Sequence, residues 1–70
     1  MEVMNGTPTG QIIATYKKSY FTINCRFSNG FYCATLHFRQ TNKTYYSKDK
    51  AEMNNYIKEQ IAKGFRRVDK

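Results

Sequence analysis

The sequence feature that most constrains the fold is a strict alternation of apolar and polar residues on both sides of Asn29-Gly30. Asn-Gly is the strongest short signal for a two-residue hairpin turn, because both central residues of a type I′ turn need a positive φ. A turn there sets the register of two antiparallel strands and brings apolar residues opposite apolar residues. The predicted pairs are Phe27 with Tyr32, Cys25 with Ala34, Ile23 with Leu36, and Phe21 with Phe38. Since a slip of one residue would move these side chains to the opposite face, the register is specific.

The alternation continues into a third strand. A second turn at Thr41-Asn42 would pair Phe38 with Tyr45 and place Tyr45 on the apolar face of the sheet. Thr-Asn is a weaker turn signal than Asn-Gly. The sequence therefore predicts a three-stranded antiparallel meander centred on Asn29-Gly30.

A C-terminal helix is predicted from about residue 50 to residue 63. Asp49 is a good N-cap, and Glu52 three residues later is the partner expected in a capping box. Gly64 suits the left-handed residue that ends many helices. The apolar residues that recur at helical spacing are Met53, Tyr56, Ile57 and Ile61. This stripe would pack against the apolar face of the sheet.

These elements predict an α+β domain of the order β-β-β-α, in which one helix covers one face of a three-stranded sheet. The sheet would have four strands if residues 11–18 form a short first strand. Residues 1–10 are interpreted as a flexible leader because they contain Gly6, Pro8 and Gly10 and no periodicity. The domain would then span residues 11–65, followed by a mobile basic tail at residues 66–70.

Length and composition narrow the class of protein. Seventy residues make one domain and leave little room for the deep pocket of an enzyme, so no catalytic residues are expected. An aromatic content of 16% is too high for a disordered chain. With 12 Lys and Arg against 5 Asp and Glu, the net charge of +7 favours polyanions or acidic proteins as partners.

The two cysteines indicate neither a metal site nor a disulfide. Cys25 and Cys33 would lie on opposite faces of the sheet, where they cannot form a disulfide with each other. We expect free thiols, with Cys25 in the core and Cys33 more exposed. His37, the only histidine, lacks the acidic neighbours that a zinc site or a catalytic triad would need, so no metal or cofactor is predicted. Without a signal peptide or a membrane-spanning segment in the sequence, we expect a cytoplasmic protein.

A single helix covers only one face of the sheet, and the other face, called the far face below, is the predicted binding surface. It has no carboxylate, and its side chains are of types that contact phosphates and base edges. The predicted nucleic-acid-binding set is Tyr20, Asn24, Arg26, His37, Arg39, Tyr46 and Lys48. An ordinary solvated sheet face is the structural alternative. The pairs Lys17-Lys18 and Arg66-Arg67 could add sequence-independent phosphate contacts.

The order of elements resembles a group of DNA-binding domains. Gly30-x-Tyr32-x-Ala34 opens the second strand and Lys43-x-Tyr45 opens the third, which is similar to the arm-binding domains of phage and transposon tyrosine integrases and to plant ethylene-response-factor domains. The resemblance covers residues 20–64, including the Asp-x-x-Glu sequence at the start of the helix.

The resemblance implies a sheet face docked in the major groove of double-stranded DNA. By matching position, the contact set would be Arg26, His37, Arg39, Tyr46 and Lys48. The chain departs from the pattern because it has no Trp, a short third strand and no catalytic domain after the helix. These departures favour an excisionase-like or other accessory factor over an integrase.

Two functions are therefore predicted from different classes. The first is a small basic accessory protein of a phage or mobile element that binds double-stranded DNA through the far face. The alternative is a compact inhibitor, similar to anti-CRISPR or other anti-defence and host-takeover proteins, which binds a host or defence protein. If the chain is phage-encoded, its location would be the cytoplasm of a bacterial host.

Overall fold

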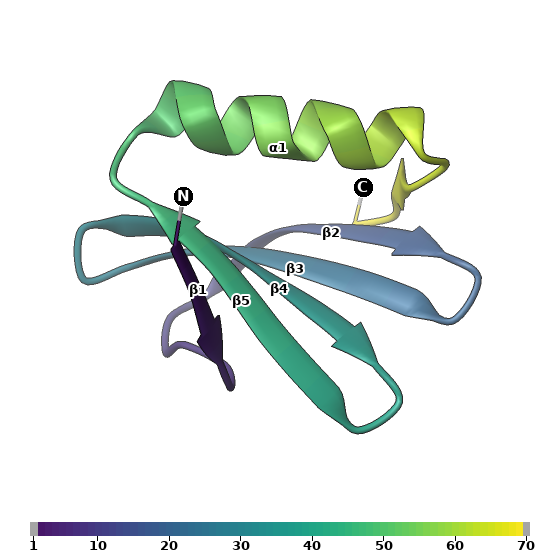
Figure 1. Ribbon diagram of the computed structural model, residues 1–70, viewed down its shortest axis with the longest axis horizontal. Coiled ribbons are helices and arrows are strands. Elements are labelled where there is room, and N and C mark those ends of the chain that lie inside the picture. Colours follow the sequence, from purple (N-terminus) through teal and green to yellow (C-terminus); the bar gives the residue numbers. More distant parts are fainter. Residues whose placement is uncertain (1, 70) are drawn as a thin grey trace.

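The computed structural model describes residues 2–69 and shows a six-stranded antiparallel sheet with one helix packed against it (Figure 1). The elements are β1 (Glu2–Asn5), β2 (Ile12–Lys18), β3 (Phe21–Ser28), β4 (Phe31–Phe38), β5 (Thr41–Ser47), α1 (Lys50–Ala62) and β6 (Arg66–Arg67). The strands lie in the order β1-β5-β4-β3-β2-β6. The prediction of a sheet with three strands, or four, is therefore wrong, although the class is still α+β.

The two edge strands come from the segments predicted as a flexible leader and a mobile tail. β1 pairs with β5, with Val3 opposite Tyr45, and β6 pairs with β2, with Arg66 opposite Lys17. All side chains of β1 and β6 are exposed, so neither segment shows the alternation that reveals a half-buried strand. Backbone hydrogen bonds to the edges of the sheet hold them instead.

The central hairpin has the predicted register. Cys25 lies opposite Ala34 and Ile23 opposite Leu36, and the turn at Asn29-Gly30 has a positive φ at both residues. At the far end of the hairpin, the rings of Phe21 and Phe38 stack with centroids 4.4 Å apart. Of residues 11–18, predicted as an optional first strand, residues 12–18 form β2.

The second hairpin turns earlier than predicted. Phe38 pairs with Thr41 instead of Tyr45, and the turn residues are Arg39 and Gln40. The predicted turn at Thr41-Asn42 is thus wrong by two residues. Because each strand residue changes its partner by an even number of positions, Tyr45 still lies on the face that α1 covers.

The helix begins and ends where its capping residues predict. The Asp49 carboxylate accepts a hydrogen bond of 2.9 Å from the Ala51 amide. At the other end, Gly64 has a φ of +114°, and the amide of Phe65 donates to the carbonyl of Gln60. Phe65 is thereby brought into the core, which consists of Ala14, Ile23, Cys25, Ala34, Met53 and Phe65.

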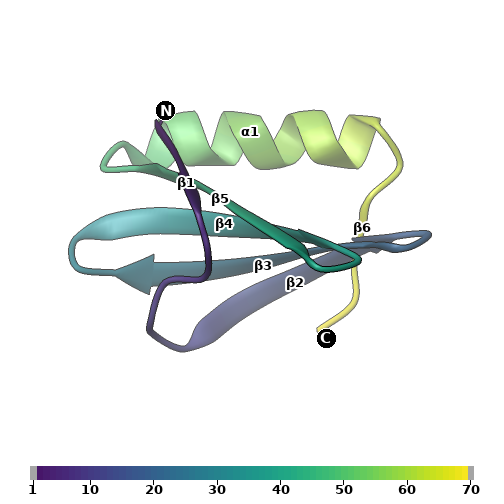
Figure 2. The same ribbon diagram turned by 60° about the horizontal axis from the view of Figure 1, so that its bottom comes forward.

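The connection from β1 to β2 is called the crossover segment, residues 6–11. Because β1 and β2 lie on opposite sides of the three central strands, this segment must cross the sheet, and Figure 2 shows it running on the side away from α1. The amide of Gly6 donates to Asn42 of β5. At its other end, Gly10 is so close to β3 that an added Cβ would lie 3.3 Å from the carbonyl oxygen of Phe27. The crossover segment therefore covers part of the far face.

Candidate nucleic-acid interface

The far face is not the open surface that the sequence predicts. Thr35 and Thr44 on this face are fully buried, and Cys33 is only 4% exposed. Thr44 donates a hydrogen bond of 2.7 Å to the carbonyl of Gly6, so the crossover segment is tied to the centre of the sheet. Cys33 was expected to be the more exposed thiol, but it lies behind this segment, where burial raises the pKa of its thiol.

Four residues of the predicted binding set lie on the far face and mostly contact their own sheet. Asn24 accepts a hydrogen bond from Thr15, and the His37 ring is hydrogen-bonded to Asn42. Arg26 and His37 are half-buried, and within residues 2–69 the atoms Arg26 Nη1 and His37 Nε2 are buried without a hydrogen-bond partner.

Tyr46, the fourth of these residues, lies with Lys48 near the start of α1. The Tyr46 ring packs edge-on against Phe31 at 5.3 Å, and the Lys48 ammonium lies 5.3 Å from the centroid of the same ring. Glu2 of β1 is paired with Tyr46. This end of the molecule therefore mixes aromatic, positive and negative groups.

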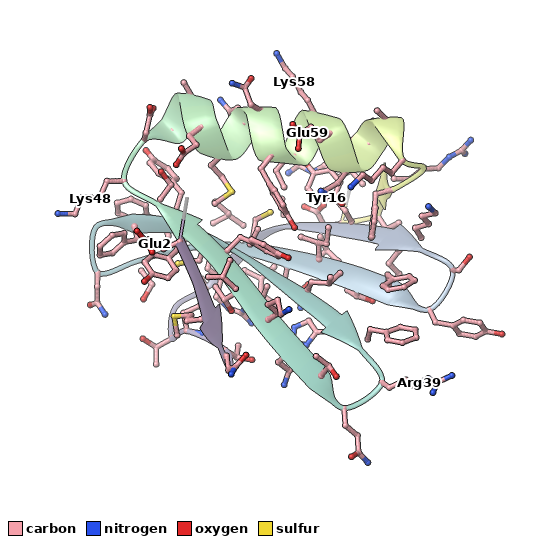
Figure 3. All side chains as sticks on the ribbon, viewed as in Figure 1. Glu2, Tyr16, Arg39, Lys48, Lys58 and Glu59 are labelled. Carbon is pink, nitrogen blue, oxygen red and sulfur yellow. The ribbon has the colours of Figure 1, made fainter. Side chains whose placement is uncertain are left out.

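The other two residues of the predicted set, Tyr20 and Arg39, occupy the turns at the opposite end. The β2–β3 turn, the β4–β5 turn and the C-terminal end of α1 all lie on the right in Figure 1. Arg39 projects from this end in Figure 3, on the side opposite to Glu2 and Lys48. We call this end the basic tip and define it as Lys17, Lys18, Tyr20, Arg39, Lys63 and Arg66.

Packing and pairing connect the parts of the basic tip. Lys17 of β2 lies opposite Arg66 of β6. The Lys18 stem packs against Gly64, directly after Lys63, with its Cε 3.3 Å from where a Cβ on that glycine would be.

On the other side of the tip, aromatic rings connect the β2–β3 turn with the β4–β5 turn. Phe21, which follows Tyr20, stacks on Phe38 and meets Phe65 edge-on. The Arg39 guanidinium lies over the Phe38 ring, 5.1 Å from its centroid. The tip is therefore one continuous surface built from β2, the two turns and the end of α1.

The basic tip carries five cations and no nearby counter-charge in its own segments. Within the described chain, residues 17–20, 39–43 and 63–66 contain no Asp or Glu. The nearest acid along α1 is Glu59, one turn before Lys63. Such a surface can bind phosphates, and the Tyr20 ring can stack on a flat ligand.

Arg67, next to the tip, is neutralised locally. Its guanidinium forms an ion pair of 2.9 Å with Asp69, whose carboxylate also accepts a hydrogen bond from the Thr15 amide. These two donors hold the pKa of Asp69 well below its usual range. The pair closes the outer edge of β2 and adds no free charge to the tip.

The described residues contain no group of three His, Cys, Asp or Glu side chains that could hold a metal ion. No helix among these residues is long and apolar enough to cross a membrane. No protein-family model, curated protein or solved structure matches the chain. The resemblance to integrase and ethylene-response-factor domains therefore stays a prediction.

The sequence places Tyr20 and Arg39 on the far face, whereas the structure has them in the turns of the basic tip, and their role in binding stays a prediction. Lys17, Lys18 and Arg66 were recognised only as accessory charge, and Lys63 was not singled out. A usable signal was the spacing of the turns, which fall ten residues apart at 19–20, 29–30 and 39–40. In a meander, alternate turns lie at the same end, which brings Tyr20 and Arg39 together.

Proposed function

We propose that this protein binds nucleic acid, with double-stranded DNA as the first ligand to test, through the basic tip. The observation that carries the proposal is the segregation of charge. Five of the twelve Lys and Arg gather at the basic tip, where the nearest acid along α1 is Glu59. Glu2, Asp49 and Glu52 lie with Lys48 and Lys50 towards the end where α1 begins. Phosphate contacts by Lys and Arg dominate the affinity of most DNA-binding proteins.

The strength and salt dependence of binding follow from the number of cations. If all five contact phosphates, the slope of log K against log salt is about −4.5 for duplex DNA, since each contact contributes about −0.9. Affinity would then fall roughly 500-fold between about 50 and 200 mM salt.

Fluorescence anisotropy with a labelled duplex of random sequence, measured across a salt series, tests the proposal. The variant Lys17→Ala/Arg66→Ala should bind more weakly and reduce the salt slope by about 1.8. The matched control is Lys50→Ala/Lys58→Ala, which removes the same charge outside the tip and should bind like the parent. Equal losses in both variants would mean that only the overall charge matters, and no binding at low salt would refute the proposal.

A second comparison separates the basic tip from the far face. Arg39→Ala should weaken duplex binding, because its guanidinium is exposed at the tip. Arg26→Ala should bind like the parent, since Arg26 is half-buried on β3 and lies outside the tip. The opposite ranking would favour docking through the far face. Circular dichroism on both variants checks that a lost affinity does not reflect lost structure.

One observation favours a second candidate, an inhibitor that binds a host or defence protein. A groove of about 340 Å³ lies between α1 and the β2–β3 side of the sheet. Its walls include Ile13, which is 55% exposed, with Met53 and Ile57. Lys50 and Lys58 also line it, and no carboxylate does. By charge complementarity, the fitting occupant is a partner segment with apolar side chains flanked by carboxylates.

The two candidate functions would be lost in different variants. A protein captured from a nuclease-treated bacterial lysate supports the inhibitor function only if Ile13→Ser and Lys50→Ala/Lys58→Ala lose it. The same protein must also be retained by Lys17→Ala/Arg66→Ala. Either candidate would act in the cytoplasm, of a bacterial host if the chain is phage-encoded, and the free thiols of Cys25 and Cys33 suit such a reducing compartment.

A further inference from the structure

Tyr20 is unusually exposed for a tyrosine. Its side chain is 85% exposed, at the second position of the two-residue turn between β2 and β3. A tyrosine ring in water contributes almost nothing to the hydrophobic core. Small and polar residues are the usual occupants of such a turn. The ring is therefore free to contact a ligand.

Arg39 occupies the neighbouring turn in an unfavourable backbone conformation. Its φ is +60°, in the left-handed region that glycine and asparagine tolerate and arginine rarely adopts. The turn at the other end of the meander has the residues that such geometry prefers, Asn29 and Gly30. Ser19 has a similar φ of +52° at the matching position of the β2–β3 turn, so the unusual feature is the presence of an arginine in this conformation.

The two side chains flank an aromatic stack. Tyr20 precedes Phe21, Arg39 follows Phe38, and the two phenylalanine rings are stacked 4.4 Å apart with an angle of 14° between their planes. The Arg39 guanidinium already lies over one of these rings. An exposed tyrosine and a held guanidinium plane are the groups on which proteins stack unpaired bases.

We propose that the basic tip recognises nucleic acid with unpaired bases, such as single strands, through stacking on Tyr20 and Arg39. This inference rests on the proposed nucleic-acid binding and adds the class of ligand. The five cations hold the phosphate backbone, and the two turns offer flat groups to bases that are not hidden in a duplex. In a duplex the same bases are stacked on their neighbours, so Tyr20 gains no partner.

The test compares a labelled mixed-sequence single strand with the duplex that it forms with its complement, by fluorescence anisotropy at one salt concentration. Tyr20→Ala should lower the affinity for the single strand roughly 5- to 150-fold, as for loss of one stacked base, and should leave duplex binding unchanged. Tyr20→Phe keeps the ring and should bind the single strand nearly as the parent does. Arg39→Lys keeps the charge without the flat guanidinium and should lose part of the single-strand affinity.

Arg39→Gly adds a readout that a purely structural role would not produce. Glycine relieves the strained φ, so the melting temperature should stay the same or rise while the single-strand affinity falls. A lower melting temperature would assign Arg39 to the fold and overturn its part in the proposal.

The failures of the two proposals are distinguishable. If neither nucleic acid binds, the proposed function and this inference both fall. If both bind and Tyr20→Ala changes neither affinity, phosphate binding stands and recognition of unpaired bases is refuted.

Discussion

Two hydrogen-bonded hydroxyl groups hold the crossover segment against the sheet. The donor–acceptor direction of these bonds predicts which hydroxyl group is more important for stability. Thr44 donates to the carbonyl of Gly6 at 2.7 Å, and the hydroxyls of Thr35 and Thr44 are 2.9 Å apart. A hydroxyl has only one proton, so Thr35 must donate to Thr44. Both side chains are fully buried, and no exposed water shell can replace a lost partner.

Thr44→Val should destabilise the protein more than Thr35→Val. Valine has nearly the shape of threonine, so neither variant leaves a cavity. Thr44→Val removes the hydrogen bond to Gly6 and leaves the buried Thr35 hydroxyl without an acceptor. Together these losses should lower the free energy of unfolding by about 2–3 kcal/mol. Thr35→Val leaves the bond from Thr44 to Gly6 in place and should cost about 1 kcal/mol or less.

Urea denaturation of the two variants measures this difference, and Thr44→Ser, which keeps the hydroxyl, serves as the control. The thiol of Cys33 gives a second readout because the crossover segment shields it. A local loss of about 2 kcal/mol should raise its alkylation rate roughly 30-fold, as located by mass spectrometry. Equal losses of stability in the two valine variants, or a larger one for Thr35→Val, would refute the assigned donor–acceptor direction.

Three further predictions concern other parts of the fold. The lowered pKa of Asp69 means that its pair with Arg67 stabilises the edge of β2 above the ordinary Asp pKa of about 3.9. This contribution is lost as the pH falls through the lowered pKa, and Asp69→Asn should abolish the acid-dependent exchange of the Thr15 amide. Burial raises the pKa of Cys25 to about 11, so its alkylation rate should keep rising with pH beyond the range of an ordinary thiol. Gly64→Ala should lower the free energy of unfolding in urea by about 1–2 kcal/mol, because its φ is +114°.

The two hairpins show how far local sequence determines the register. Asn29 and Gly30 both tolerate the positive φ that their turn requires, and the sequence predicts the partner of each residue in the first hairpin. In the second, Asn42 is a better turn residue than Arg39, yet the chain turns at Arg39. Pairing of β5 with both β4 and β1 outweighs that local preference. The face on which each β5 side chain lies was predicted correctly only because the register shift against β4 is an even number of residues.

The far face was misjudged because its covering comes from a segment with no apolar pattern. The crossover segment contains Gly6, Pro8 and Gly10, which indicate a loop but not where it runs. The hint lay in the sheet itself. Small residues without charge, Cys33, Thr35 and Thr44, occupy the middle of this face, which suits close approach of another backbone better than contact with water.

Two features of the basic tip work against stability and agree with the proposed binding of a polyanion. Lys17 and Arg66 lie directly opposite each other on neighbouring strands, where like charges repel. Arg39 holds a left-handed φ that glycine would adopt without strain. A single substitution would relieve either feature. The proposed polyanion would neutralise the opposed cations and use the guanidinium where the turn holds it.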